Sequence, residues 1–299
     1  MSMIEIRNLT KDYGLSRGIF NIDLEVKKGE IFGFVGTNGS GKTTTIRNMM
    51  GFIRPDSGSV YIMDHEVNYD TTQIMRHIGY VPGEIAFPDI GDGDAFLKSQ
   101  AEMMGLKTME YAKYLINKFK LDTTANLKHM SKGMKQKTAI VQAFMAEPDI
   151  LILDEPSTGL DPLMRETFVD VLMEARQRGA TIFMSSHVFE EVEKTCDRVA
   201  LLHNGKVLDI VDMKKIRHNE VKTYKVGFED ERDYQNYVNL NLYITSKNDK
   251  YMQVTVDIKD AQVNEFMKVL AQFNLKYIKE VKYTLKKYFL KKISEDNEK

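Results

Sequence analysis

Eight residues near the N-terminus leave few folds open to the chain. They read Gly36-Thr37-Asn38-Gly39-Ser40-Gly41-Lys42-Thr43 and match the spacing G-x-x-x-x-G-K-[ST]. Residues 31–35 before them form a short apolar run typical of a buried strand. Residues 44–50 after them have the pattern of a helix, and Gly51 follows where helices commonly end. This order of strand, glycine-rich loop and helix is the context in which the spacing has chemical meaning.

The loop has the composition of a site for phosphate groups. Its glycines let backbone N–H groups turn toward an anion at the N-terminus of the following helix. The Lys42 ammonium can reach the β- and γ-phosphates of a nucleotide, and the Thr43 hydroxyl can ligate Mg²⁺. The other predicted nucleotide contacts are Gly36, Thr37, Asn38, Gly39, Ser40, Gly41 and Thr44. The alternative, a chance glycine turn before a structural lysine, is disfavoured because strand, loop and helix agree.

Two acidic residues follow a second buried strand. Residues 150–153 are all apolar and deliver Asp154 and Glu155 to the carboxyl end of that strand, where α/β sheets place their ligands. Asp154 suits the outer coordination shell of Mg²⁺, and Glu155 suits orienting or deprotonating an attacking water. Taken alone, the pair would more simply end a strand and cap a helix. Beside a phosphate-binding loop, the two carboxylates predict a site that hydrolyses a nucleotide.

Strand and helix patterns alternate up to about residue 215. Helical spacing covers residues 94–146 and 165–178, and residues 181–184 form another buried strand. Asn204-Gly205 lies between two apolar runs and predicts a hairpin. Strands separated by helices predict an α/β fold with a parallel sheet over residues 1–215.

Residues 216–299 have a different pattern. Tyr224, Val226 and Phe228 alternate with polar residues, as do the apolar residues between 252 and 258, which predicts half-buried strands. Apolar residues between 263 and 273 have helical spacing. These residues predict a small C-terminal α+β domain.

Three further segments resemble the signature sequences of the ATP-binding cassette (ABC) ATPases. Residues 130–137 precede Asp154 and are similar to the LSGGQ-type signature, with Ser131 and Gly133 in matching positions. Residues 157–161, Ser-Thr-Gly-Leu-Asp, resemble the family's D-loop, and Ser185-Ser186-His187 resembles the segment that carries its switch histidine. The resemblance covers roughly residues 1–215. It implies a P-loop ATPase core of the ABC type, with an inserted helical subdomain at about residues 84–147.

The resemblance also implies roles for single residues. Tyr13 stands where the family stacks an aromatic ring on adenine, and His187 where it contacts the γ-phosphate and the attacking water. Lys42, Glu155 and His187 would be the catalytic residues, and Ser131 and Gly133 would close over ATP bound to the opposite subunit. The implied functional unit is a dimer of this chain, or of this chain with a related one. Taken alone, Tyr13 and His187 would be structural and Ser131 an ordinary helix cap.

Two departures from the family pattern concern the signature and the coupling step. Gly83-Glu84 follows Pro82 where the family usually has a glutamine that touches Mg²⁺ and leads to the membrane contact. Glu84 is the candidate substitute, either as a metal ligand or as a residue that faces the membrane partner. Lys132 and Met134 replace a glycine and a glutamine of the signature. Both departures resemble ABC-2-type exporter ATPases, a branch that includes bacitracin and peptide-antibiotic efflux systems.

Composition restricts the partners and the compartment. The 42 basic and 43 acidic residues give a net charge of −1, so no general attraction to nucleic acid or to an anionic membrane is expected. The single cysteine, Cys196, excludes an intrachain disulfide and fits a reducing compartment. No run of residues is apolar enough to span a membrane, and the N-terminus has no secretory signal.

We therefore expect an ATP- and Mg²⁺-dependent ATPase subunit that powers efflux of a drug or amphipathic peptide. It would be cytoplasmic and held on the inner face of the cell membrane by separate polytopic permease subunits, with no nucleic-acid partner. The alternative is a soluble, non-transport ABC ATPase that acts on nucleic acid or ribosomes. Such proteins commonly carry two cassettes or long coiled-coil insertions, and the sequence shows neither.

Overall fold

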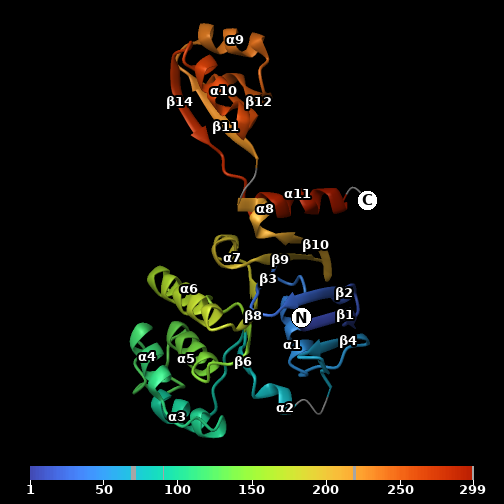
Figure 1. Cartoon of the computed structure of the whole chain (residues 1–299), viewed down its shortest axis with the longest axis vertical. Helices are drawn as coiled ribbons and strands as arrows, with labels where there is room; N and C mark the ends of the chain where they lie inside the picture. Colours follow the sequence, from blue (N-terminus) through green and yellow to red (C-terminus); the bar gives the residue numbers. More distant parts are fainter. Residues whose placement is uncertain (69–71, 90, 218–219, 298–299) are drawn as a thin grey trace. The chain divides into compact units, whose positions relative to one another are not determined.

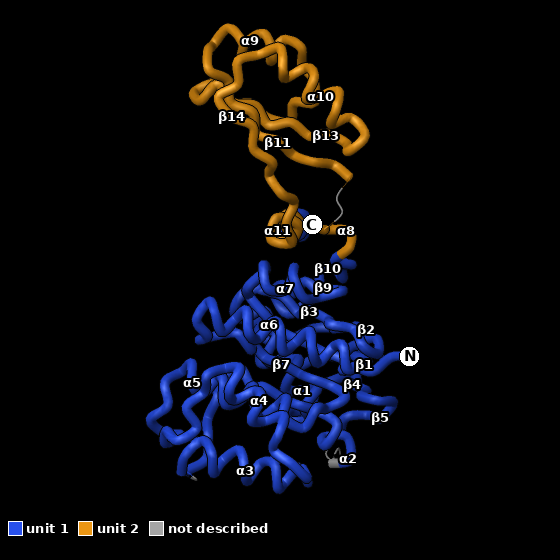
Figure 2. Tube along the Cα trace, turned by 60° about the vertical axis from the view of Figure 1, so that its left-hand side comes forward, with its two compact units in different colours: residues 1–213, 292–299 blue, residues 214–291 orange. Residues whose placement is uncertain are grey.

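The computed structural model describes residues 1–68, 72–89, 91–217 and 220–297. It divides into two compact units, which Figure 2 shows in different colours. Unit 1 comprises Met1–Met213 and Lys292–Lys299, and unit 2 comprises Lys214–Lys291. This division falls two residues before the predicted boundary at residue 215. The residues from Lys292 onward, which were predicted to belong to the C-terminal domain, group with unit 1 instead, where Lys292 Nζ lies 3.7 Å from Asp209 Oδ2.

A six-stranded sheet forms the centre of unit 1 (Figure 1). Its order is β10-β9-β3-β8-β7-β6, and all neighbouring strands are parallel except β10 and β9. All residues of β3, β7 and β8 are buried, as expected where helices cover both faces of a parallel sheet. The predicted α/β class is therefore confirmed. The strands are β3 (Ile31–Gly36), β6 (Ile78–Val81), β7 (Ile150–Asp154), β8 (Thr181–Ser186), β9 (Arg198–His203) and β10 (Lys206–Asp212).

The register of the central strands brings the predicted site residues to one edge of the sheet. Val35 of β3 pairs with Ser186 of β8, and Asp154 of β7 pairs with Ser185. The glycine-rich loop, the Asp154-Glu155 pair and His187 therefore all leave the sheet at the carboxyl ends of adjacent strands. Open α/β sheets bind their ligands at this edge.

A second sheet in unit 1 is antiparallel and has the order β2-β1-β4-β5. Helix α1 (Lys42–Met49) packs between the two sheets and buries Ile46 and Met49 in a core to which both sheets contribute. This packing fixes the helix whose N-terminus receives the glycine-rich loop. The strands are β1 (Ser2–Asp12), β2 (Gly18–Lys27), β4 (Ser57–Ile62) and β5 (His65–Glu66).

The helices of unit 1 include the predicted helical segment. Helix α3 (Gly93–Met103) begins after Asp92, whose side chain accepts a hydrogen bond from the Ala95 N–H at 2.8 Å. The described residues from Glu84 to Asp92 contain no helix, so the helical part starts later than residue 84. Pro88 disfavours an earlier start because proline lacks the backbone donor of a helix interior. The other helices are α2 (Thr72–Met75), α4 (Glu110–Lys118), α5 (Lys132–Phe144), α6 (Pro162–Gln177) and α7 (Phe189–Thr195).

Unit 2 is built on an antiparallel sheet of order β12-β13-β11-β14. The predicted alternation is confirmed, because Val226 and Phe228 are fully buried. Two helices cover this core with Tyr237 and Phe266. The elements are β11 (Val221–Phe228), α9 (Glu231–Leu240), β12 (Ile244–Asn248), β13 (Gln253–Lys259), α10 (Val263–Leu270) and β14 (Leu275–Glu280), while the division between units falls within α8 (Met213–Arg217) and α11 (Leu285–Asn297).

Candidate functional site

The glycine-rich loop approaches its neighbours so closely that only glycine fits at two positions. A Cβ atom on Gly36 would lie 2.4 Å from Ser40 Oγ, and one on Gly41 would lie 2.5 Å from Ile19 Cγ2. Gly41 also has a φ angle of 108°, which side chains disfavour. The loop is thus held as a tight turn that ends at the N-terminus of α1. This is the geometry of a phosphate-binding loop.

Lys42 lies beneath this loop. Its Nζ donates hydrogen bonds to Gly36 O at 2.9 Å and to Thr37 O at 3.2 Å, and the residue is only 6% exposed. Thr37, Asn38 and Gly39 are exposed at the tip of the loop. Thr43 is exposed and Thr44 is half-buried, both in the first turn of α1. A buried ammonium under exposed backbone suits an anion that rests on the loop from outside.

Asp154 is fully buried beside the loop. Its Oδ1 accepts a hydrogen bond from Ser185 Oγ at 2.6 Å. Burial raises the pKa of the Asp154 carboxyl, the Ser185 and Thr43 hydroxyls lower this pKa, the nearby Glu155 raises it and Lys42 lowers it. The net direction is upward. The buried surroundings therefore make ionisation of Asp154 less favourable than in water, and a bound cation would offset this cost.

The second oxygen of Asp154 fits a role in holding Mg²⁺. Among the described residues, Asp154 Oδ2 has no hydrogen-bond partner although it is buried. A Cβ atom on Gly83 would lie 2.8 Å from this oxygen, so the glycine at position 83 leaves the carboxylate uncovered. Mg²⁺ is commonly held by one or two carboxylates together with substrate phosphates. Asp154 and the Thr43 hydroxyl beside it are therefore a suitable donor set.

Glu155 connects Lys42 with His187. Its Oε1 lies 3.2 Å from Lys42 Nζ, and its Oε2 lies 2.5 Å from His187 Nδ1. The Glu155 backbone has a φ angle of 51°, a conformation that residues with side chains rarely adopt, and its N–H donates to Ser185 Oγ at 3.0 Å. Such backbone strain is often found at functional sites. The three predicted catalytic residues are therefore brought together in the structure.

Tyr13 lies in a short loop that ends next to the phosphate-binding loop. The Tyr13 N–H donates to Arg17 O at 2.8 Å, and the residue is 55% exposed. Gly18, which follows this loop, has its carbonyl oxygen 3.2 Å from where a Cβ atom on Gly41 would lie. An exposed ring at this place is available to stack on a base.

Ser131 and Gly133 are not brought to Lys42. Ser131 is exposed at the N-terminus of α5, where its Oγ accepts a hydrogen bond from the Met134 N–H at 3.3 Å. Gly133 packs against the segment 157–161, since a Cβ atom on it would lie 2.9 Å from Gly159 O. Glu84 is exposed, and its side chain has no hydrogen bond or ion pair in the described part of the chain. The roles predicted for these three residues would therefore require a partner subunit or a ligand.

Ser185 is a site residue to which the sequence assigns no role. Its hydroxyl donates to Asp154 Oδ1 and accepts from the Glu155 N–H, so it orients both acidic residues. The only sequence signal is its place in Ser185-Ser186-His187, directly after a buried strand.

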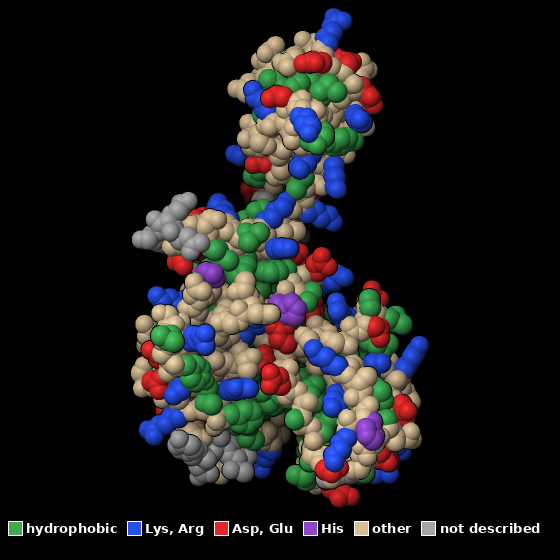
Figure 3. All heavy atoms as spheres, turned by 180° about the vertical axis from the view of Figure 1, so that it is seen from behind, with side chains coloured by type: hydrophobic (Ala, Val, Ile, Leu, Met, Phe, Trp, Pro, Cys, Tyr) green, Lys and Arg blue, Asp and Glu red, His purple; other side chains and the backbone are tan. Residues whose placement is uncertain are grey.

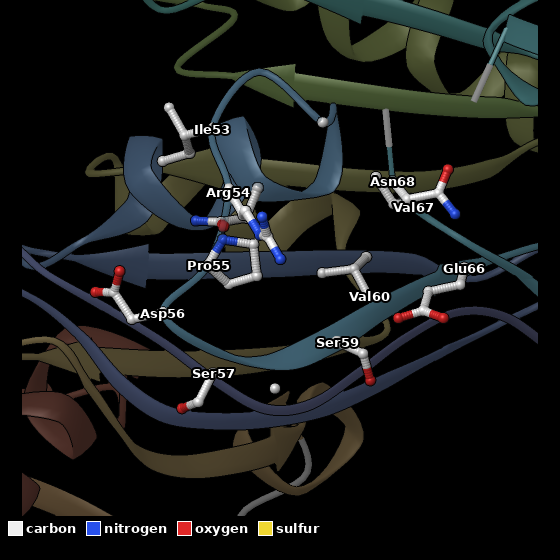
Figure 4. Close-up of a pocket in the computed structure, with 13 residues that line it drawn as sticks. Ile53, Arg54, Pro55, Asp56, Ser57, Ser59, Val60, Glu66, Val67 and Asn68 are labelled. Carbon is white, nitrogen blue, oxygen red and sulfur yellow. The ribbon is translucent and has the colours of Figure 1, made fainter. Parts of the chain in front are cut away.

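A separate cavity of about 420 Å³ lies elsewhere on unit 1 (Figure 4). Arg54, Asp56 and Glu66 contribute charged groups to its wall, between the segment after α1 and strands β4 and β5. None of the predicted nucleotide, metal or catalytic residues lines it. The cavity is therefore distinct from the site at the sheet edge.

Comparison with known proteins finds similar ATP-binding proteins. The family model of the ABC transporter matches residues 19–158. The chain is 33% identical over 236 residues to the bacitracin transport ATP-binding protein BcrA of Bacillus licheniformis, which covers 77% of this chain and 76% of that protein. It is 29% identical over 300 residues to an uncharacterized ABC transporter ATP-binding protein, YhcH, of Bacillus subtilis (strain 168), with 99% of this chain and 98% of that protein covered.

A solved cassette shares the fold. This dimeric ATP-binding cassette, in a post-hydrolysis state with ADP and Pi bound, is 22% identical and has a TM-score of 0.64, covering 71% of this chain and 99% of its own. The family match includes both the glycine-rich loop and the Asp154-Glu155 pair, which Lys42 and Glu155 bring to within 3.2 Å of each other. The chain therefore belongs to the ABC transporter family as one of its ATP-binding proteins, and its activity is that of an ATPase.

Proposed function

We propose that the chain powers an exporter that moves a drug or an amphipathic peptide out of the cell through separate membrane subunits. The observation that carries the proposal is the convergence of Lys42, Glu155 and His187 in a chain similar to a bacitracin transport ATP-binding protein. Gly83-Glu84 and Lys132 depart from the usual ABC pattern in the way that ABC-2-type exporter ATPases do. These departures therefore support an exporter.

Each side chain of the site has a task that its position supports. Lys42 and the loop backbone bind the phosphates, and the exposed Tyr13 ring stacks on adenine. Glu155 orients or deprotonates the attacking water, while His187, 2.5 Å from its Oε2, holds the carboxylate and reaches the γ-phosphate. Asp154 and Thr43 would hold Mg²⁺, which when bound screens the phosphate charges.

A second subunit would complete the site. Ser131 and Gly133 lie at the N-terminus of α5, where backbone N–H groups favour an anion. Because Ser131 is exposed and has no contact with Lys42, it is free to approach ATP bound to another copy or to a related chain. ATP binding would draw the two subunits together, and hydrolysis would release them.

A groove of about 480 Å³ is the proposed docking place for the permease. Phe52, Phe87 and Met104 are among the apolar residues that line it, and Phe52 is 58% exposed. Tyr80 and Pro82 of the segment that leads to Glu84 also form its wall. An amphipathic helix from a cytoplasmic loop of the permease fits such a groove. Movement of this segment would then connect the docked helix with Asp154, which Gly83 adjoins.

The proposed location follows from this docking. Among the described residues, no helix combines the length and the apolar character needed to cross a bilayer. We place the chain in the cytoplasm, held at the inner face of the cell membrane by the permease. The alternative partner, nucleic acid or the ribosome, has less support, since Figure 3 shows acidic and basic side chains mixed over the visible face.

The test uses the whole chain with a candidate polytopic membrane partner. Co-expression and purification from membranes should recover both, with ATP hydrolysis faster than that of the chain alone. Phe52→Glu should abolish co-purification and leave the isolated hydrolysis rate within about twofold, because it adds charge to the apolar groove. Tyr251→Glu, at a residue that is 62% exposed in unit 2, is the matched control and should change neither. Co-purification unaffected by Phe52→Glu would refute docking in this groove.

A further inference from the structure

Glu191 is a buried acidic residue outside the set to which a role in binding or hydrolysis is assigned above. It lies on α7, four residues after His187, and is 8% exposed. Its Oε2 accepts a hydrogen bond from Ser157 Oγ at 2.6 Å, and its Oε1 is buried without a hydrogen-bond partner among the described residues. A buried carboxylate with an unmatched oxygen lowers stability. Stability alone therefore does not favour glutamate at this position.

The Ser157–Glu191 hydrogen bond joins the two segments that carry the water-handling residues. Ser157 follows Glu155 by two residues, and Glu191 follows His187 by four. The segments are thus connected twice, once between Glu155 and His187 and once between Ser157 and Glu191. The first connection is open to solvent, since the His187 side chain is 51% exposed. The second is shielded, since Ser157 is 4% exposed.

The loop after Glu155 is held from three helices. Gln136 of α5 donates a hydrogen bond to Pro156 O at 2.7 Å, and Arg165 of α6 donates from Nε to Leu160 O at 3.1 Å. Glu191 of α7 supplies the third connection. Of the three helices, α7 begins two residues after His187, so the described Ser157–Glu191 bond adds to the direct Glu155–His187 contact between the same two segments.

Charged groups on both segments, the one after β7 and the one after β8, act on the Glu191 carboxyl. Burial raises the pKa of the Glu191 carboxyl; the Ser157 hydroxyl lowers it, Glu155 raises it, and Arg165 and His187 lower it. The carboxyl is therefore affected by both water-handling residues and by α6 at the same time.

We infer that Glu191 is a positioning residue for hydrolysis: through Ser157 it fixes the segment that carries Glu155 at a set distance from His187. The inference rests on the proposed function, in which Glu155 and His187 act on the attacking water. A displacement of a catalytic group by about 1 Å can lower a rate by about 100-fold. Loss of the Ser157–Glu191 bond should therefore slow hydrolysis without weakening ATP binding.

The experiment measures kcat, the KM for ATP and the melting temperature of the full chain and five variants. Glu191→Ala and Ser157→Ala should each lower kcat by about tenfold to 100-fold, with KM within about twofold. The double variant should be no slower than the slower single variant, because both changes remove one bond. Glu191→Gln should recover most of kcat, because its amide oxygen still accepts from Ser157. Glu190→Ala removes an exposed acid next along α7 and should behave as wild type.

Three results would overturn the inference. One is a wild-type kcat in Glu191→Ala. Another is multiplication of the two single losses in the double variant, which is expected of a general loss of packing. The third is a Glu191→Gln variant as slow as Glu191→Ala, since the hydrogen bond would then not be the cause. Glu155→Gln tests the proposed role of Glu155 separately: retained turnover in that variant would overturn the proposed mechanism, whereas a wild-type kcat in Glu191→Ala would overturn only this inference.

Discussion

Lys42 Nζ lies 3.2 Å from Glu155 Oε1, so the ammonium at the end of the glycine-rich loop and the carboxylate that follows β7 are direct partners. Phosphates that approach Lys42 compete with Glu155 for the same ammonium. When the Lys42 ammonium binds a phosphate of ATP, it would release the Glu155 carboxylate. Glu155 would then contact only His187 and the attacking water. In the proposed mechanism, the ion pair would thus link binding of the nucleotide to preparation of the base.

Glu155→Gln should separate ATP binding from hydrolysis. The amide keeps the shape of the side chain and cannot accept a proton, so kcat should fall by about 100-fold or more. ATP affinity should rise, because Lys42 loses its competing carboxylate, and the variant should accumulate as an ATP-bound dimer. Equilibrium ATP binding, single-turnover hydrolysis and light scattering measure these effects. Glu110→Gln, at an exposed residue of α4, is the control; unchanged turnover in Glu155→Gln would remove Glu155 from the mechanism.

Asp154→Asn should raise the melting temperature of the protein measured without Mg²⁺ and ATP. Because the folded pKa of Asp154 is raised, its ionised form costs stability above that pKa, and this cost vanishes below the unfolded value of about 3.9. The gain in melting temperature should therefore be present at pH 8 and shrink as the pH falls toward 4. Thermal unfolding at several pH values measures it, with Mg²⁺-dependent hydrolysis expected to be lost. A lower melting temperature at pH 8 would contradict the sign of the effect.

Glu84→Ala should act on coupling to the membrane partner. The Glu84 side chain is exposed and has no hydrogen bond or ion pair among the described residues, so the isolated ATPase rate should stay within about twofold of wild type. Stimulation of that rate by the co-purified permease should be lost. Slow hydrolysis by the isolated variant would assign Glu84 to the metal instead, and wild-type behaviour in both assays would leave coupling to other residues.

Phe228→Ala should destabilise unit 2 alone. The Phe228 ring is fully buried and packs on Tyr237 and Phe273, with ring centroids 5.4 and 6.1 Å away. Truncation of such a ring costs about 3–5 kcal/mol of unfolding free energy. Calorimetry should show one transition moving to lower temperature while a second transition and the ATPase rate stay unchanged. Tyr251→Ala, at an exposed residue of the same unit, should shift neither transition; a joint shift in Phe228→Ala would show that the units unfold together.

The residues that lie within one short segment could be predicted from sequence because each segment carries its own geometry. The loop from Gly36 to Thr43 lies between a buried strand and a helix as expected, and β7 delivers Asp154 to the end of the sheet. Asn204 and Gly205 have φ angles of 47° and 75°, which the predicted hairpin requires of its turn.

Contacts between distant segments could not be predicted in this way. Ser185 and Asp154 meet because β8 and β7 are neighbours in register, and Glu191 meets Ser157 because α7 packs near the loop after β7. Neighbour choice and register depend on how whole elements pack, which local periodicity does not record. Helix α9 was not predicted because its apolar pattern is weak. Its buried side is narrow, with Tyr234 and Tyr237 as its buried residues.

Unit 2 is entered from Met213 and left at Lys292, and both of these residues belong to unit 1. It is therefore an insertion with two covalent tethers and not an appended tail. A proteolytic cut before unit 2 would separate it covalently from Met1–Met213, whereas a cut after it would leave it joined to them. The residues that return to unit 1 form the second half of α11, so exchange of the inserted module would have to preserve the junctions within α8 and α11.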